Sequence, residues 1–136
     1  MKKKLGVVLM FVSWLSQAVE MNLDARNGMS GELRDGVRMA TGRILCREAH
    51  SEFHIWMNTQ QVENRPGRYI VEGKYNTRHK IRVRLEGDGW LSSAINASRD
   101  VIKVGSAEQA AFDVVADGNQ SVAPDEYIFT VSGECL

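Results

Sequence analysis

Short runs of alternating apolar and polar residues, separated by turn-forming dipeptides, constrain the fold of this 136-residue chain most strongly. In KIRVRLE, for example, Ile81, Val83 and Leu85 alternate with basic residues, as expected of a strand with one buried face. Turn signals such as Asp88-Gly89 and Asp117-Gly118 recur between such runs. No window shows an amphipathic helix, the best being a single turn around residues 107–111. Many short strands at close spacing predict an all-β antiparallel sandwich.

The amino-terminal segment has the order of a secretory signal peptide. MKKK is followed by the apolar run LGVVLMFVSWL and then by Ser16, Gln17 and Ala18. A membrane anchor is the competing interpretation, but it needs about 20 apolar residues followed by a charged stop. We therefore predict a signal peptide over residues 1–18 that is cleaved after Ala18, and one domain over residues 19–136.

The exported part contains both cysteines, Cys46 and Cys135. An oxidising compartment permits a disulfide, and both cysteines have the inward parity of their predicted strands. A bridge would then join two core faces, and the chain-entropy model gives it a stabilisation of roughly 4–5 kcal/mol. Two free thiols are the alternative.

Known catalytic and ligand-binding motifs are missing from the sequence, which contains no G-x-S-x-G, phosphate loop or zinc-binding helix. His50, His54 and His79 lie in or beside predicted strands, so their spacing does not favour a metal site. We predict no enzyme, cofactor or metal. The full chain has 17 basic and 17 acidic residues. Removal of Lys2, Lys3 and Lys4 with the signal peptide leaves 14 basic and 17 acidic residues in the exported part. This balance argues against non-specific nucleic-acid binding.

A basic stripe lies on one face of the strand that contains KIRVRLE. It consists of Arg78, Lys80, Arg82 and Arg84. Such a stripe is typical of the solvated face of an outer strand, where charge discourages aggregation, and an acidic partner is the alternative.

The order Cys46, Trp56, Cys135 is similar to the cysteine-tryptophan-cysteine order of immunoglobulin domains. In those domains the strand with the second cysteine is the sixth, and a seventh pairs with it. Only Leu136 follows Cys135 here. The pattern therefore predicts either a sandwich with an exposed apolar groove and unpaired backbone, or a missing strand that another chain supplies.

Several longer blocks resemble the AfaD/DraD-type invasin subunits of the Afa/Dr adhesins and the minor subunits of aggregative adherence fimbriae. The blocks are LRDG (33–36), ATGRILCREAH (40–50), FHIWMN (53–58), GDGW (87–90) and FDVVADGNQSVAPDEYIFTVSGEC (112–135). Residues 91–107 depart from the family pattern, so the resemblance assigns them no role.

This resemblance implies an incomplete immunoglobulin-like sandwich that lacks its last strand and carries a Cys46–Cys135 disulfide. A periplasmic chaperone and then the amino-terminal extension of the major subunit would complete it, which is donor strand complementation. The chain would pass through an outer-membrane usher to a fimbrial tip or the cell surface, or be secreted. We expect the groove for the donated strand beside five residues: Leu23, Ala25, Tyr127, Phe129 and Val131.

The resemblance also implies adhesion to host cells and invasion of them through integrins. Only two residues, Val19 and Glu20, precede the strand predicted to begin at Met21, too few for a donor segment. We therefore predict a subunit that accepts a strand but cannot donate one. The alternative function is a free secreted or periplasmic sandwich that binds a carbohydrate or small ligand.

Overall fold

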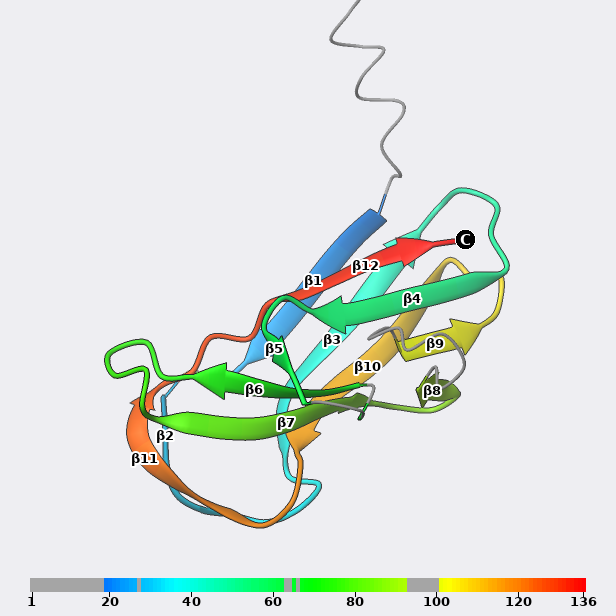
Figure 1. The fold of residues 1–136 in the computed structure, drawn as a ribbon. Helices are drawn as coiled ribbons and strands as arrows, with labels where there is room; N and C mark the ends of the chain where they lie inside the picture. Colours follow the sequence, from blue (N-terminus) through cyan, green and yellow to red (C-terminus); the bar gives the residue numbers. More distant parts are fainter. Residues whose placement is uncertain (1–18, 27, 63–64, 66, 93–100) are drawn as a thin grey trace, which may run out of the picture.

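The computed structural model describes residues 19–136 except 27, 63–64, 66 and 93–100, and it contains strands without any helix in this part of the chain (Figure 1). Consequently no helix that could cross a membrane occurs there. The strands are β1 (Val19–Ala25), β2 (Gly28–Leu33), β3 (Arg38–Cys46), β4 (Glu52–Met57), β5 (Gln60–Gln61), β6 (Arg68–Glu72), β7 (Lys80–Glu86), β8 (Trp90–Ser92), β9 (Val101–Val104), β10 (Gln109–Ala116), β11 (Gln120–Glu126) and β12 (Val131–Cys135). The predicted all-β class is confirmed. The predicted signal peptide and its cleavage after Ala18 fall outside the described residues.

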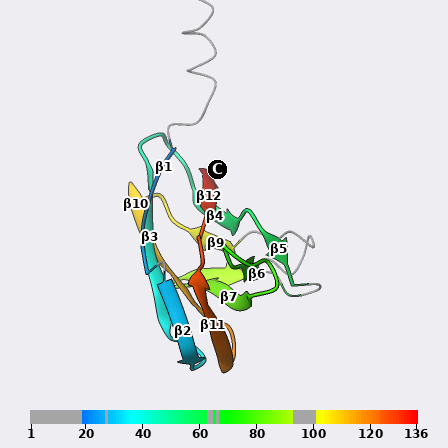
Figure 2. The ribbon, with the colours of Figure 1, turned by 90° about the vertical axis from the view of Figure 1, so that its left-hand side faces the viewer.

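Two sheets form the two layers of a sandwich. The larger has the strand order β1-β3-β10-β7-β6-β5, and the smaller has the order β12-β4-β9-β8. A separate pair, β11-β2, lies at one end of the molecule. Viewed from the side in Figure 2, β1, β3 and β10 lie in one layer and β12, β4 and β9 in the other. Each layer therefore ends in a strand from one end of the chain, β1 or β12.

The burial pattern of the strands follows the alternation seen in the sequence. In β7, Ile81 and Val83 are completely buried, whereas Lys80 and Arg82 are exposed. The sequences of β4 and β6 are apolar on both faces, and the structure turns Phe53, Ile55 and Met57 of β4, together with Tyr69 and Val71 of β6, into the core. Residues 109–111, near the weak helical signal, belong to β10.

The core tryptophan is Trp90. Its ring packs against Phe53 and Phe112 with centroid distances of 6.4 and 6.2 Å, and its Nε1–H donates to the carbonyl of Ala111 at 2.7 Å. Trp56 is only half-buried, because it alternates with the inward-facing Ile55 and Met57 of β4. Trp56, the tryptophan in the cysteine-tryptophan-cysteine order, therefore does not fill the core position that the immunoglobulin pattern gives it.

The run EYIFTVSGEC (126–135), whose apolar residues alternate as in a single strand, is divided between two sheets. β11 ends at Glu126 on its partner β2, and β12 begins at Val131 on β4. The residues between them carry the chain from one pair to the other. This transfer makes β12 the last strand of its sheet.

Candidate functional site

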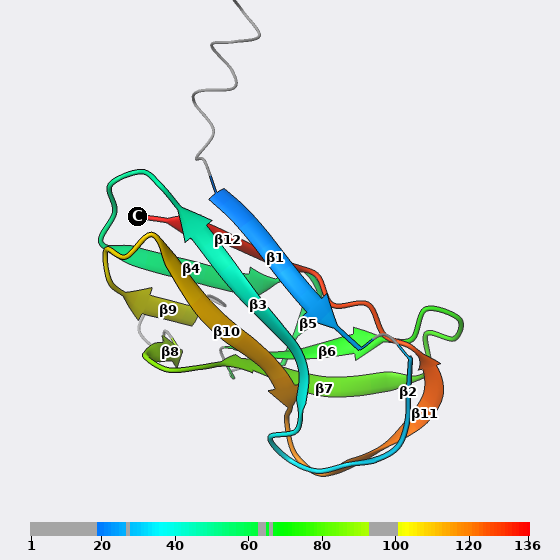
Figure 3. The same cartoon turned by 180° about the vertical axis from the view of Figure 1, so that it is seen from behind.

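The sandwich is open along one side, where β1 and β12 lie next to each other and run in opposite directions (Figure 3). Within the part of the chain that the structure describes, β1 pairs only with β3, and β12 pairs only with β4. Among the described residues, no ladder of hydrogen bonds joins β1 to β12. We call these two strands, β1 and β12, the open edge.

The backbone of β1 offers hydrogen-bonding groups to the open edge. Arg26 N–H donates to the carbonyl of Met39 at 3.1 Å, in line with the β1–β3 register. Because every second residue of an antiparallel strand bonds to its partner, Asp24 and Asn22 also face β3. The odd-numbered residues Val19–Ala25 therefore turn their N–H and C=O groups away from β3, toward β12.

The backbone of β12 also offers hydrogen-bonding groups to the open edge, from the side opposite β1. Leu136 and Glu52 exchange two hydrogen bonds of 2.9 Å, and Asn58 N–H donates to the carbonyl of Thr130 at 3.2 Å. The even-numbered residues of this segment therefore face β4. The polar backbone groups of Val131, Gly133 and Cys135 face the open edge, where an additional strand would satisfy them.

Apolar side chains form the floor between the two strands. Four side chains of β1 pack on the core but are only half-buried, namely Val19, Met21, Leu23 and Ala25. On β12, Val131 and Cys135 are buried. A Cβ atom on Gly133 would lie 2.8 Å from Met21 Cε and 2.7 Å from Ile44 Cδ1. Gly133 thus leaves room for Met21 to cross the gap.

The open edge is narrow at this point. Cα atoms of β1 and β12 approach within 8 Å, whereas two strands with a third between them are separated by roughly 9.5 Å, twice the usual spacing. β1 and β12 must therefore move apart at their nearest approach before a third strand can bond to both.

The structure places the five predicted groove residues in two groups. Leu23, Ala25 and Val131 belong to the open edge itself. Tyr127 and Phe129 precede β12 and are almost entirely buried. The prediction omitted Val19, Met21 and Gly133, although they share the parity of Leu23 and Val131, and this shared parity was the signal that could have found them.

Tyr127 has a structural role away from the open edge. Its backbone forms an isolated bridge with Gly73, and its hydroxyl donates to the carbonyl of Ala123 at 2.7 Å. This is the hydrogen bond of a tyrosine corner, in which a tyrosine hydroxyl bonds to backbone a few residues upstream. The bond occurs although glycine, not tyrosine, stands two residues before Cys135.

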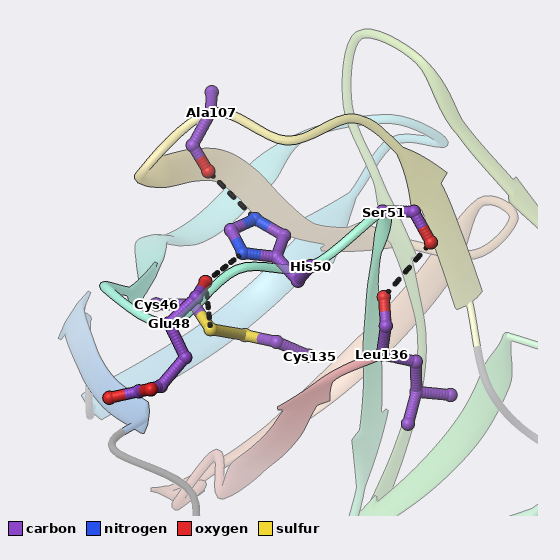
Figure 4. Close-up of a disulfide and its surroundings, with 7 residues drawn as sticks. All are labelled: Cys46, Glu48, His50, Ser51, Ala107, Cys135 and Leu136. Carbon is purple, nitrogen blue, oxygen red and sulfur yellow. Dashed lines mark hydrogen bonds between the residues drawn. A yellow bond between two sulfur atoms is a disulfide. The ribbon is translucent and has the colours of Figure 1, made fainter.

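A disulfide joins Cys46 at the end of β3 to Cys135 at the end of β12 (Figure 4). The two Cα atoms are 6.5 Å apart, and the cysteines are 89 residues apart in the sequence. Val19 pairs with Cys46 in the β1–β3 ladder, so the bridge lies beside the beginning of β1. It therefore connects the two layers at one end of the open edge.

A buried carboxylate fixes the loop between β6 and β7, residues 73–79, which we call the hairpin loop. The side chain of Asp125 is 1% exposed and accepts hydrogen bonds from Tyr75 N–H at 3.1 Å, Asn76 N–H at 3.2 Å and His79 Nδ1 at 2.9 Å. Burial alone raises the pKa of Asp125, but these bonds outweigh burial and the pKa is lowered. A Cβ atom on Gly73 would collide with this carboxylate, so the close approach requires glycine.

All three histidine rings have oxygen partners. His50 lies between the carbonyl oxygens of Glu48 and Ala107, at 2.7 and 2.8 Å (Figure 4), and His54 Nε2 lies 2.6 Å from Glu52 Oε1. His79 bonds to Asp125 as described above. Within the described residues, no group of three or more His, Cys, Asp or Glu side chains could hold a metal ion.

Solved structures of fimbrial subunits share this immunoglobulin-like sandwich, which places the chain in the class of fimbrial adhesin subunits. The Hda pilus minor tip subunit HdaB of Escherichia coli matches with a TM-score of 0.81 and 38% identity, over 86% of this chain and 82% of that one. A chain from enteroaggregative Escherichia coli AAF fimbriae, solved in work on fibronectin binding and biofilm formation, matches with a TM-score of 0.80 and 50% identity, over 88% of each chain.

Sequence comparison gives the particular family. The family model "Enterobacteria AfaD invasin protein" matches residues 29–133. Protein AfaD of Escherichia coli is 49% identical over 136 residues, which are 100% of this chain and 92% of AfaD. The chain therefore belongs to the AfaD invasin family, and it is an exported, surface-associated adhesin subunit.

Proposed function

We propose that this chain is the tip subunit of a chaperone-usher fimbria and that its open edge receives one strand from a companion major subunit. The observation that carries the proposal is the pair of edge strands whose free backbone groups face each other. Val19, Met21, Leu23 and Ala25 supply this edge from β1, and Val131, Gly133 and Cys135 supply it from β12. A donated strand with apolar residues at alternate positions would bond to both strands and cover the half-buried floor.

The same strands support a subunit that accepts a strand without giving one. β1 is paired with β3 along its whole length, beginning at Val19 opposite Cys46. Residues 19–25 are therefore used within the chain's own sheet. In this proposal a periplasmic chaperone fills the open edge first, and an outer-membrane usher passes the subunit to the fibre.

Host-cell binding is part of the proposal. The family name describes invasins, and the AAF fimbriae that contain a related chain were solved in work on fibronectin binding. We propose that an exposed face of this sandwich, displayed at the fibre end, contacts a host-cell receptor, for which the family resemblance suggests an integrin.

The decisive experiment supplies the missing strand in the same polypeptide. The amino-terminal donor segment of the major subunit is fused after Leu136 through a short flexible linker. Covering about 400–600 Å² of apolar surface gives on the order of 10 kcal/mol before ordering costs are subtracted. We expect thermal unfolding to shift upward by tens of degrees.

The matched control carries the same donor with its alternate apolar residues changed to serine, and it should unfold like the unfused chain. If the unfused monomer is already as stable as the fusion, the sandwich closes on itself. That result would favour the alternative of an independent ligand-binding domain.

A further inference from the structure

Four arginines surround a shallow hollow on the outer surface, three strands away from β1 in the order of the larger sheet. The hollow measures about 630 Å³ and lies between the outer face of β6–β7 and the two turns that follow β2 and β10. Its charged lining consists of Arg65, Arg68, Arg82, Arg84, Asp35 and Asp117. We call it the arginine hollow.

Its centre is an ordered set of ion pairs. Arg68 and Arg84 lie directly opposite each other on β6 and β7, where repulsion between their like charges is destabilising. Both reach Asp117 Oδ1, at 3.3 and 3.2 Å, and Arg84 Nη1 also donates to Asp35 Oδ1 at 2.7 Å. The hydrogen bond from Arg84 is the main cause of the lowered pKa of Asp35. These contacts hold Arg84 and Arg68 in fixed positions.

The carboxylates that line the hollow, Asp35 and Asp117, form their ion pairs with Arg84 and Arg68. Arg84 Nε also donates to Glu86 Oε1 at 3.0 Å, so Arg84 alone contacts three carboxylates. The side chain of Arg82 donates a long hydrogen bond from Nη2 to the carbonyl oxygen of Asn119, at 3.4 Å. Neither Arg82 nor Arg65 forms an ion pair with another residue that the structure describes. Positive charge therefore remains at the rim of the hollow, although acidic residues outnumber basic ones in residues 19–136.

We propose that the arginine hollow binds sulfate groups of an acidic glycan. Arginine suits this ligand because its planar guanidinium donates two parallel hydrogen bonds to an oxyanion. Arg82 and Arg84 are two residues apart on one strand, so their Cα atoms repeat at about 6.6 Å along an extended path. Two cations at this spacing match a chain that carries repeated anionic groups.

The lining disfavours two other polyanions. A single-stranded nucleic acid needs aromatic platforms for its bases, and the hollow is lined by arginine, aspartate, one glycine and one valine. An acidic peptide that adds as a strand needs a free sheet edge, but β7 is paired with β6 on one side and β10 on the other. A glycan recognised through charge and hydrogen bonds needs neither feature.

The experiment measures binding of a heparin-derived octasaccharide to the full exported chain by titration calorimetry. The strand-complemented fusion is used if it is stable and the unfused chain otherwise, so binding is scored separately from strand acceptance. Arg65→Gln/Arg82→Gln removes the two arginines that form no ion pair with another described residue and leaves the contacts of Arg84 intact. We expect this double variant to bind at least tenfold more weakly, with a shallower dependence of affinity on salt.

A matched control removes two exposed arginines elsewhere, Arg26→Gln/Arg43→Gln, and should leave the affinity within twofold of the parent. An octasaccharide without sulfate but with its carboxylates, and a poly-glutamate of equal charge, should both bind at least tenfold more weakly than the sulfated one. The proposal is overturned if the parent does not bind, if both double variants lose affinity equally, or if either unsulfated polymer binds as tightly.

Discussion

The hairpin loop and the open edge differ in whether their backbone N–H and C=O groups have hydrogen-bond partners. In the hairpin loop, the N–H groups of Tyr75 and Asn76 reach the buried carboxylate of Asp125, and Gly73 N–H donates to the carbonyl of His79 at 2.8 Å. At the open edge, the N–H and C=O groups of β1 and β12 face each other without a ladder between them. A chain that satisfies its loop so fully leaves this edge unpaired for a partner, as expected of a strand acceptor.

Removing the disulfide should have the largest effect on this contrast. The Cys46→Ala/Cys135→Ala variant frees the two layers at one end of the open edge, and a loop of 89 residues gives about 4–5 kcal/mol on the chain-entropy model. Urea unfolding of the strand-complemented chain would measure the loss. Thiol labelling of the denatured, unreduced parent should find no free cysteine, and two labelled cysteines would contradict the bridge.

Filling the space above Gly133 should have an intermediate effect. Gly133→Ala places a Cβ atom against Met21, Ile44 and the carbonyl of His54, and such overpacking costs about 1–3 kcal/mol. The matched control is Gly105→Ala, since an added Cβ there meets no atom within 4 Å. Chemical denaturation of both variants checks this prediction. Equal stability of the two variants would show that the open edge has more space at Gly133 than the structure gives it.

The hairpin loop should give the smallest effect, with a dependence on pH. The pKa of Asp125 is lowered in the folded chain, so its contribution to stability is present above the usual carboxyl range and is lost as the pH falls through the folded-state pKa, below about 4. Asp125→Asn should lower the melting temperature by roughly 5 °C at pH 7 and by less at pH 3. Thermal unfolding at both pH values measures this, and a difference that grows at pH 3 would contradict the assigned ionised state.

Local alternation predicted much of the fold because burial follows parity within each strand. The burial of Ile81, Val83 and Leu85 could be predicted without knowing which strands lie beside them. The same holds for the inward parity of the two cysteines. The sequence did not show that Trp90 rather than Trp56 packs in the core, because β4, which carries Trp56, is apolar enough on both faces that its sequence does not decide which face turns inward.

The candidate site depended more on contacts between distant parts of the chain. Leu23, Ala25 and Val131 follow from the parity of the two edge strands, and so does Met21, but the contact between Met21 and Gly133 is seen only when β1 lies beside β12. The hairpin loop depends on Asp125, about 50 residues further along the chain, and the arginine hollow combines strand residues with two remote turns. No local pattern encodes such pairings. Charge compensation in the hollow likewise becomes visible only when Asp35 and Asp117 lie beside Arg84.

The Cys46–Cys135 bridge also has a mechanical consequence. It closes residues 46–135 into a covalent ring that contains β4 to β12. If a pull on an attached fibre unfolded the domain, the ring could not be drawn out, whereas an open chain with the same 89-residue separation would lengthen by roughly 300 Å. Under tension, extension within the described part of the chain is therefore limited to the residues outside this ring, and the four arginines of the arginine hollow lie inside it.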